Sequence, residues 1–154
     1  MSELTYQESI VVACSPEKLY DLVSDVTRTG EWSPVCKECW WDEGAGPYAG
    51  AWFNGRNEEP GRTWETRSKV LVAERGKEFT WVVNGNLVRW SYTLEPVDDA
   101  TRLTESWEFL PAGLEFFDEK FGDDAPNQVQ HRIRSARTGI PATLAAIKGI
   151  AERE

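Results

Sequence analysis

The sequence has 154 residues, of which 40% are hydrophobic and 28% charged, and its formal net charge is −9. This length and composition are typical of one soluble globular domain, so we expect a single domain over residues 1–154. The negative charge repels phosphate backbones and anionic lipid headgroups, and therefore argues against nucleic-acid and membrane partners.

The first part of the chain predicts a strand followed by two short helices. Residues Leu4–Val12 alternate apolar and polar side chains with the period of two that a half-buried strand shows. Ser15-Pro16-Glu17 supplies a helix cap, a proline for the first helical position and an acid in the first turn. Apolar residues then recur at helical spacing at Leu19, Leu22, Val23 and Val26. A second short helical turn carries Trp32 and ends before Pro34.

The middle of the chain predicts six antiparallel strands joined by short turns. Their ranges are Lys37–Glu43, Ala51–Glu58, Thr63–Arg75, Glu78–Asn84, Leu87–Pro96 and Thr101–Leu110. Asn84-Gly85 predicts a two-residue hairpin, because both residues tolerate a positive φ. We expect Ala51–Glu58 to be an edge strand, which makes a homodimer through strand pairing possible.

The last part of the chain predicts a lid-like loop and one long helix. Ala112–Ala125 is polar and acidic, and we expect a loop there with at most one helical turn. The final helix begins with Asp124 as its cap and Pro126 in its first turn. Pro141 lies inside the apolar pattern of that helix, so the helix either kinks or restarts there.

This order of elements predicts an α+β fold. A seven-stranded curved antiparallel sheet wraps around the long C-terminal helix, with the two short helices after the first strand. One helix cannot fill the concave face of so wide a sheet, so inward side chains of the strands should line a cavity.

The sequence resembles the START-like, birch-pollen-allergen-like and polyketide cyclase/dehydrase superfamily over essentially the whole chain. The likeness is carried by Ser15–Pro34, Ala51–Asn57, Thr63–Val70, Arg89–Pro96 and Thr101–Phe109. The resemblance implies the helix-grip fold and a deep cavity for an apolar or aromatic small molecule. It implies no particular activity, since the superfamily includes lipid carriers, hormone receptors and aromatase/cyclases.

Glu105 is the residue whose position most invites a functional role. Alternation in the last strand places it on the same face as Leu103 and Trp107, which must point into the interior. A carboxyl group there needs a partner, or its pKa rises. Glu105 therefore either meets a ligand or moves a proton, or else it forms a buried ion pair with Arg56 or Arg67 or accepts a Trp N–H.

The same alternation selects further residues as candidate ligand contacts. They are Trp32, Phe53, Asn57, Trp64, Trp81, Trp90, Tyr92 and Trp107, in addition to Glu105. Buried Tyr and Trp need partners for their O–H and N–H groups, and these tips are natural contacts for a ligand hydroxyl or carbonyl. The alternative is that the rings only fill the core, and that Asn57 only caps a turn.

Cys36 and Cys39 have the Cys-x-x-Cys spacing of zinc and thiol–disulfide sites. With Cys14 and His131 they make a Cys₃His set by count, and Cys14 would lie near Cys36 if the first two strands were neighbours. However, residues three apart in a strand point to opposite faces, and Lys37-Glu38 offers no tight turn. We therefore expect no metal site, redox centre or cofactor, and a surface or packing role for His131.

The N-terminal sequence and the cysteine count bear on location. The polar MSELTYQES lacks the apolar core of a signal peptide, and no apolar run approaches the roughly 18 residues of a membrane-spanning helix. Three cysteines cannot all pair within one chain. We expect a reduced, cytoplasmic protein.

Three functions remain open from the sequence. The first is a binding protein that holds an apolar or aromatic small molecule, lipid-like or polyketide-like. The second is a polyketide cyclase or dehydratase that uses Glu105 or Tyr92 as acid or base, although catalysis usually needs two convergent titratable groups. The third is an acidic interaction or regulatory module.

Overall fold

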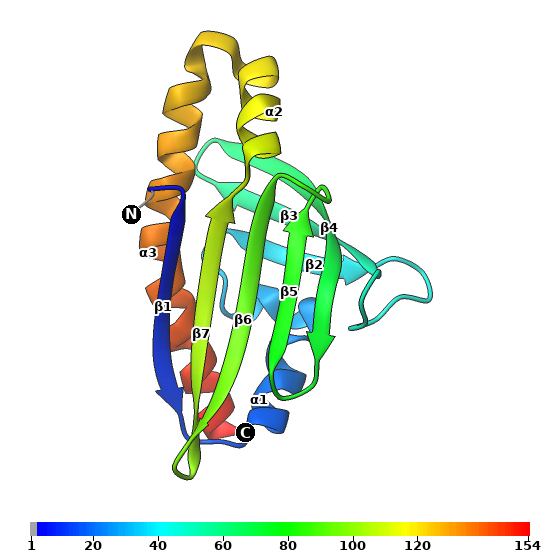
Figure 1. The fold of residues 1–154 in the computed structure, drawn as a ribbon, viewed down its shortest axis with the longest axis vertical. Helices are drawn as coiled ribbons and strands as arrows, with labels where there is room; N and C mark the ends of the chain where they lie inside the picture. Colours follow the sequence, from blue (N-terminus) through cyan, green and yellow to red (C-terminus); the bar gives the residue numbers. More distant parts are fainter. Residues whose placement is uncertain (1–2) are drawn as a thin grey trace.

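The computed structural model describes residues 3–154 and places seven strands in one antiparallel sheet of order β1-β7-β6-β5-β4-β3-β2 (Figure 1). The strands are β1 (Thr5–Val12), β2 (Cys36–Trp41), β3 (Trp52–Glu59), β4 (Arg62–Glu74), β5 (Glu78–Val83), β6 (Val88–Val97) and β7 (Ala100–Phe109). Each begins and ends within two residues of its predicted bounds. The seven-stranded antiparallel sheet predicted from the sequence pattern is confirmed, and so is the helix-grip fold that the resemblance implies.

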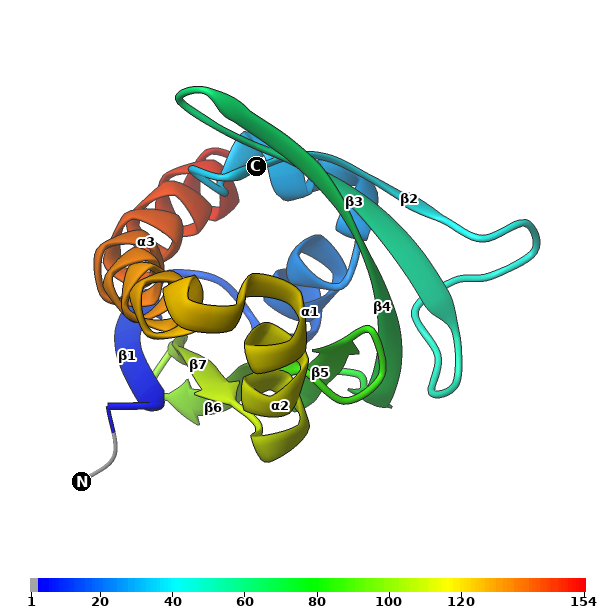
Figure 2. The ribbon, with the colours of Figure 1, turned by 90° about the horizontal axis from the view of Figure 1, so that it is seen from above.

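Helices pack on the concave side of this sheet (Figure 2). They are α1 (Pro16–Val23), the 3₁₀ helix η1 (Val26–Glu31), α2 (Pro111–Phe121), the 3₁₀ turn η2 (Gly122–Asp124) and α3 (Ala125–Arg153). Ser15 caps α1 as predicted, because its Oγ accepts a hydrogen bond of 3.2 Å from the backbone N–H of Lys18. The helix α3 packs against β1 and β7, and α1 packs against β5, β6 and β7.

The predicted lid-like loop is wrong, since most of Ala112–Ala125 belongs to the helix α2. Pro111 occupies the first helical turn, and Gly113 and Phe117 form the buried side of the helix. Gly113 allows a close approach to the β5–β6 loop, because a Cβ there would clash with the carbonyl oxygen of Leu87. The acidic residues that indicated a loop lie on the outer side of this helix.

Three further expectations are corrected by the topology. The strand β3 is paired with both β2 and β4, so Ala51–Glu58 does not form an edge of the sheet; the edges are β1 and β2. The β5–β6 loop spans residues 84–87 rather than two residues, although Asn84 and Gly85 both have the predicted positive φ. Of the two outcomes expected at Pro141, a restart is wrong, because α3 runs through this residue as one helix.

Candidate functional site

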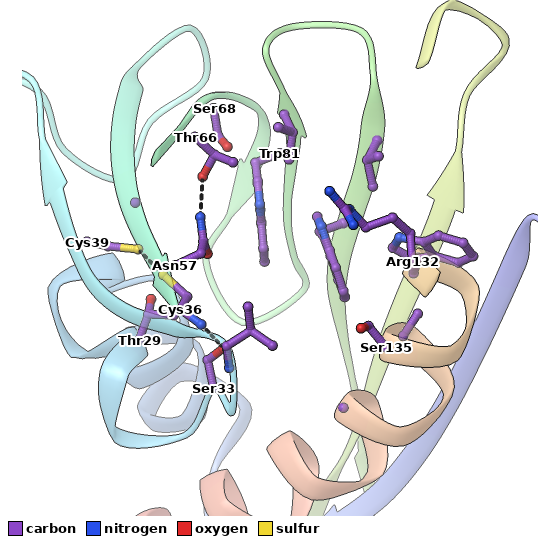
Figure 3. Close-up of a pocket in the computed structure, with 18 of the residues that line it drawn as sticks. Thr29, Ser33, Cys36, Cys39, Asn57, Thr66, Ser68, Trp81, Arg132 and Ser135 are labelled. Atoms are coloured by element: carbon purple, nitrogen blue, oxygen red, sulfur yellow. Dashed lines mark hydrogen bonds between the residues drawn. The ribbon is translucent and has the colours of Figure 1, made fainter. Parts of the chain in front are cut away.

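The concave face encloses a cavity of about 600 Å³ between the strands β2–β7 and the helices η1, α2 and α3 (Figure 3). This volume lies within the range of small-molecule sites in proteins. The helix α3 contributes a stripe at helical spacing that consists mainly of small residues. The stripe comprises Arg132, Ser135, Ala136, Gly139, Ile140 and Thr143. Small side chains on this stripe leave the space open.

Aromatic side chains form most of the opposite wall. Trp81 and Trp90 are paired across β5 and β6, and their rings stack with centroids 6.4 Å apart. Phe53 packs edge-on against Trp81 at 6.1 Å. Every residue predicted as a ligand contact lines the cavity: Trp32, Phe53, Asn57, Trp64, Trp81, Trp90, Tyr92, Glu105 and Trp107. Their contact with a ligand stays a prediction.

Glu105 and Tyr92 lie side by side at the deep end of the cavity. They are directly paired between β7 and β6, and each is only 4% exposed. Oε1 of Glu105 is buried and has no hydrogen-bond partner in the part of the chain that the structure describes. The expected ion pairs are wrong, because Arg56 pairs with Glu38 and Glu58 and Arg67 pairs with Asp42 on the other face of the sheet.

Burial controls the protonation of both groups. It raises the pKa of Glu105 well above the usual carboxyl range. The pKa of Tyr92 is also raised, first by burial and then by the Glu105 charge, while hydrogen bonding with Trp32 works in the opposite direction. The neutral forms are therefore favoured, and the pair presents O–H donors to the cavity.

Asn57 is fixed by the neighbouring strand rather than by a turn. Its Nδ2 donates to the carbonyl oxygen of Trp64 at 3.4 Å and to Oγ1 of Thr66 at 3.3 Å. The turn-capping alternative is therefore wrong. These bonds hold the amide at the cavity wall, where Figure 3 shows it directed toward Thr66.

Arg132 is a candidate site residue that the sequence reasoning missed. It extends from α3 into the cavity (Figure 3), with its guanidinium 5.7 Å from the ring centre of Trp64 and 5.3 Å from that of Phe117. Its Nη1 is buried without a hydrogen-bond partner among residues 3–154. Burial, helped by the charge of Arg62 and opposed by Glu59, lowers the pKa of Arg132 to about 10, so it stays cationic at neutral pH.

One signal in the sequence could have indicated Arg132. It begins the stripe of small residues on α3. Small residues on one face of a helix leave space beside it, so a long cationic side chain on that face is expected to extend into a cavity rather than into solvent. Arg62 and Lys120 also line the cavity, as does Glu59, whose charge acts on Arg132. The cations outnumber this carboxylate, which gives the Arg132 end of the cavity an excess of positive charge despite the acidic chain.

The expectation that Cys36 and Cys39 point to opposite faces is wrong. A bulge shifts the β2–β3 register between Cys36 and Glu38, and both sulfurs lie on the cavity side, with Sγ atoms 3.1 Å apart. The suggested proximity of Cys14 is also wrong, because β1 and β2 are opposite edges of the sheet. Among residues 3–154, no group of three or more potential metal ligands comes together.

His131 does not join the cysteines. Its Nε2 lies 3.0 Å from Oε1 of Glu59, near the β3–β4 turn. This contact fits the expected packing role of His131 and ties α3 to β3.

A protein-family model described as "Polyketide cyclase / dehydrase and lipid transport" matches residues 3–144. The chain belongs to this family. No curated protein matches the sequence significantly.

Solved structures with the same fold support the assignment. The Polyketide_cyc-like protein Cgl2372 from Corynebacterium glutamicum is 54% identical, with a TM-score of 0.72 over 97% of this chain and 91% of that one. The di-domain ARO/CYC StfQ from the steffimycin biosynthetic pathway is 15% identical, with a TM-score of 0.71 over 97% of this chain and 51% of StfQ. A START superfamily protein from Mycobacterium smegmatis is 16% identical, with a TM-score of 0.68 over 97% of each chain. The last two show the fold alone.

Within residues 3–154, the helices are all too short or too polar to cross a membrane. The longest, α3, spans 29 residues and carries charged side chains along its length.

Proposed function

We propose that this protein binds an elongated small molecule that has an apolar or aromatic body, an anionic group at one end and a hydrogen-bond acceptor at the other. The observation that carries this proposal is a cavity of about 600 Å³ with aromatic walls and an unpartnered polar group at each end. Unpartnered buried polar groups are costly in a folded protein unless a ligand satisfies them.

Residues of the strand β7 lie near both polar groups. Phe109 packs against Phe117 with ring centres 5.0 Å apart, and the Arg132 guanidinium lies over Phe117. Glu105 precedes Phe109 by four residues in this strand, a backbone separation of roughly 13 Å. An elongated molecule would extend from the cationic end toward the Glu105–Tyr92 pair, with its body against the tryptophan rings.

The family description, polyketide cyclase, dehydrase and lipid transport, supports a ligand of this kind. Lipid-like and polyketide-like molecules both combine a long apolar or unsaturated body with carbonyl or carboxyl groups. The cationic end suits a carboxylate, and the two O–H donors suit a carbonyl or hydroxyl oxygen.

A second candidate is a cyclase or dehydratase in which Glu105 or Tyr92 acts as acid or base. The adjacent positions of the two residues favour it, because two donors on one carbonyl oxygen would stabilise an enolate. Burial raises the pKa of both groups, however, which favours their protonated forms and disfavours an ionised base in this pair. Binding without reaction therefore remains the better-supported function, and the open cavity weighs against a purely acidic interaction module.

Native mass spectrometry of the freshly purified protein tests whether a small molecule co-purifies. Titrations with cis-parinaric acid, a fluorescent polyene carboxylate, and with its neutral methyl ester then test whether the anionic group of a ligand binds at the Arg132 end. Arg132→Gln should weaken binding of the acid by about 10-fold or more, the worth of a charged hydrogen bond, and leave the ester unchanged. Arg134→Gln, on the exposed side of the same helix, is the matched control.

Equal losses for the acid and the ester in Arg132→Gln would show that the arginine only shapes the cavity. Absence of binding for both probes, together with a clean apo mass, would refute the ligand-binding proposal itself.

A further inference from the structure

Two thiols face each other in the wall of the cavity, at the start of β2. Sγ of Cys36 lies 3.1 Å from Sγ of Cys39, and both cysteines are free (Figure 3). The bulge between Cys36 and Glu38 produces this arrangement, because one additional residue reverses the alternation and brings both side chains to the same face. We propose that Cys36 and Cys39 form a reversible thiol–disulfide site, independent of which ligand the cavity holds.

The facing strand leaves room for the two sulfurs. Gly55 is paired with Cys39, and a Cβ at Gly55 would lie 3.4 Å from the Sγ of both Cys36 and Cys39. The missing side chain therefore creates the space in which the sulfurs meet. A disulfide requires an S–S length of about 2.05 Å, so the sulfurs need to approach by only about 1 Å.

The two thiols differ in the way that disulfide formation requires. A hydrogen bond from Cys39 lowers the pKa of Cys36, and the charges of Arg56 and Lys37 act in the same direction against burial. The hydrogen bond to Cys36 and burial raise the pKa of Cys39. Cys36 is partly exposed whereas Cys39 is buried. Cys36 is thus the attacking thiolate and Cys39 the resolving thiol.

The oxidant is a peroxide that is small enough to enter the cavity. The Cys36 thiolate attacks one oxygen of hydrogen peroxide, the O–O bond breaks, and the released hydroxide takes up a proton and leaves as water. The sulfur of Cys39 then attacks the Cys36 sulfenic acid, the S–O bond breaks, and the thiol proton leaves with the hydroxyl as a second water. The two sulfurs lose two electrons and the peroxide gains two.

Thiol counting on the reduced full-length protein tests the proposal. After treatment with one equivalent of hydrogen peroxide, the protein is denatured, labelled with iodoacetamide and weighed by intact mass spectrometry. Labelled cysteines should fall from the three free thiols to one, and dithiothreitol should restore all three. Peptide mapping should place the link between Cys36 and Cys39 within one chain.

The variants separate the two roles. Cys14→Ser is the matched control and should still lose two thiols on oxidation. Cys39→Ser should stop disulfide formation and leave a sulfenic acid at Cys36 that dimedone traps. The wild-type measurement decides the question without depending on the folding of any variant. Three labels after peroxide, a link through Cys14, or sulfinic acid at Cys36 without a link would overturn the proposal.

Discussion

Glu105→Gln should be more stable than the wild type at neutral pH, and this difference in unfolding free energy should grow as the pH rises. The side chain of Glu105 is 4% exposed, and burial alone raises its pKa well above the usual range. The folded state therefore keeps the proton that the unfolded state releases above about pH 4.3. Between the unfolded and folded pKa values the folded protein binds more protons, so this carboxyl contributes less to stability with each step toward higher pH.

The size of the effect follows from this linkage. Each pH unit inside the window removes about 1.4 kcal/mol from the free energy of unfolding of the wild type. Glutamine has nearly the shape of the protonated acid and does not titrate. Near pH 4 the two proteins should differ little. From pH 5 to pH 7 the difference should grow by up to about 2.7 kcal/mol in favour of Glu105→Gln, as long as the pH stays below the folded-state pKa.

Urea unfolding followed by tryptophan fluorescence measures this difference, because the chain contains eight tryptophans. The control is Glu108→Gln, which alters an exposed carboxylate paired with Arg89 on the other face of β7. That change should stay within about 0.5 kcal/mol. If the difference in unfolding free energy between Glu105→Gln and the wild type is constant from pH 5 to pH 7, the reasoning that Glu105 is a buried carboxyl without a partner is refuted.

Two substitutions test how α2 closes the cavity. Phe117→Ala should cost about 3 to 5 kcal/mol of unfolding free energy, because the ring is 7% exposed and packs on Phe109 and Phe121. A loss below about 1 kcal/mol in urea unfolding would mean that Phe117 does not anchor α2. Gly113→Ala should cost about 1 to 3 kcal/mol of unfolding free energy through overpacking, because the new Cβ meets the Leu87 carbonyl oxygen. Amide hydrogens of α2 should also exchange faster in this variant. Exchange protection equal to that of the wild type would contradict the close approach of Gly113 to Leu87.

The strands and the buried carboxyl could be predicted because both depend on alternation alone. Leu103 and Trp107 must face the interior, and Glu105 shares their parity whatever the strand order is. The aromatic cavity wall follows from the same rule. These features needed no knowledge of which strand pairs with which.

The features that were missed depend on information that a pattern does not carry. The position of the edge strands follows from the chain crossing from β1 to β2, which places these strands at opposite edges of the sheet. The shared face of Cys36 and Cys39 follows from a single bulge, since one additional residue reverses the parity of everything before it. The helix α2 forms because Phe117 and Gly113 are buried by tertiary contacts, which outweigh an acidic composition.

Arg132 and Glu105 lie in one cavity but too far apart to neutralise each other, which links stability to function. Both have a buried polar atom without a partner in the described chain, and each such group costs about 1 to 3 kcal/mol. The cavity wall between Arg132 and Glu105 consists mainly of aromatic rings, which supply no opposite charge to either group. A ligand that satisfies both ends therefore removes two penalties of the empty protein at once, and binding should raise the unfolding free energy in proportion to the logarithm of ligand concentration. A ligand that reaches only one end removes one penalty, so the increase in unfolding free energy at one fixed excess of ligand should be smaller for a molecule that spans less of the cavity.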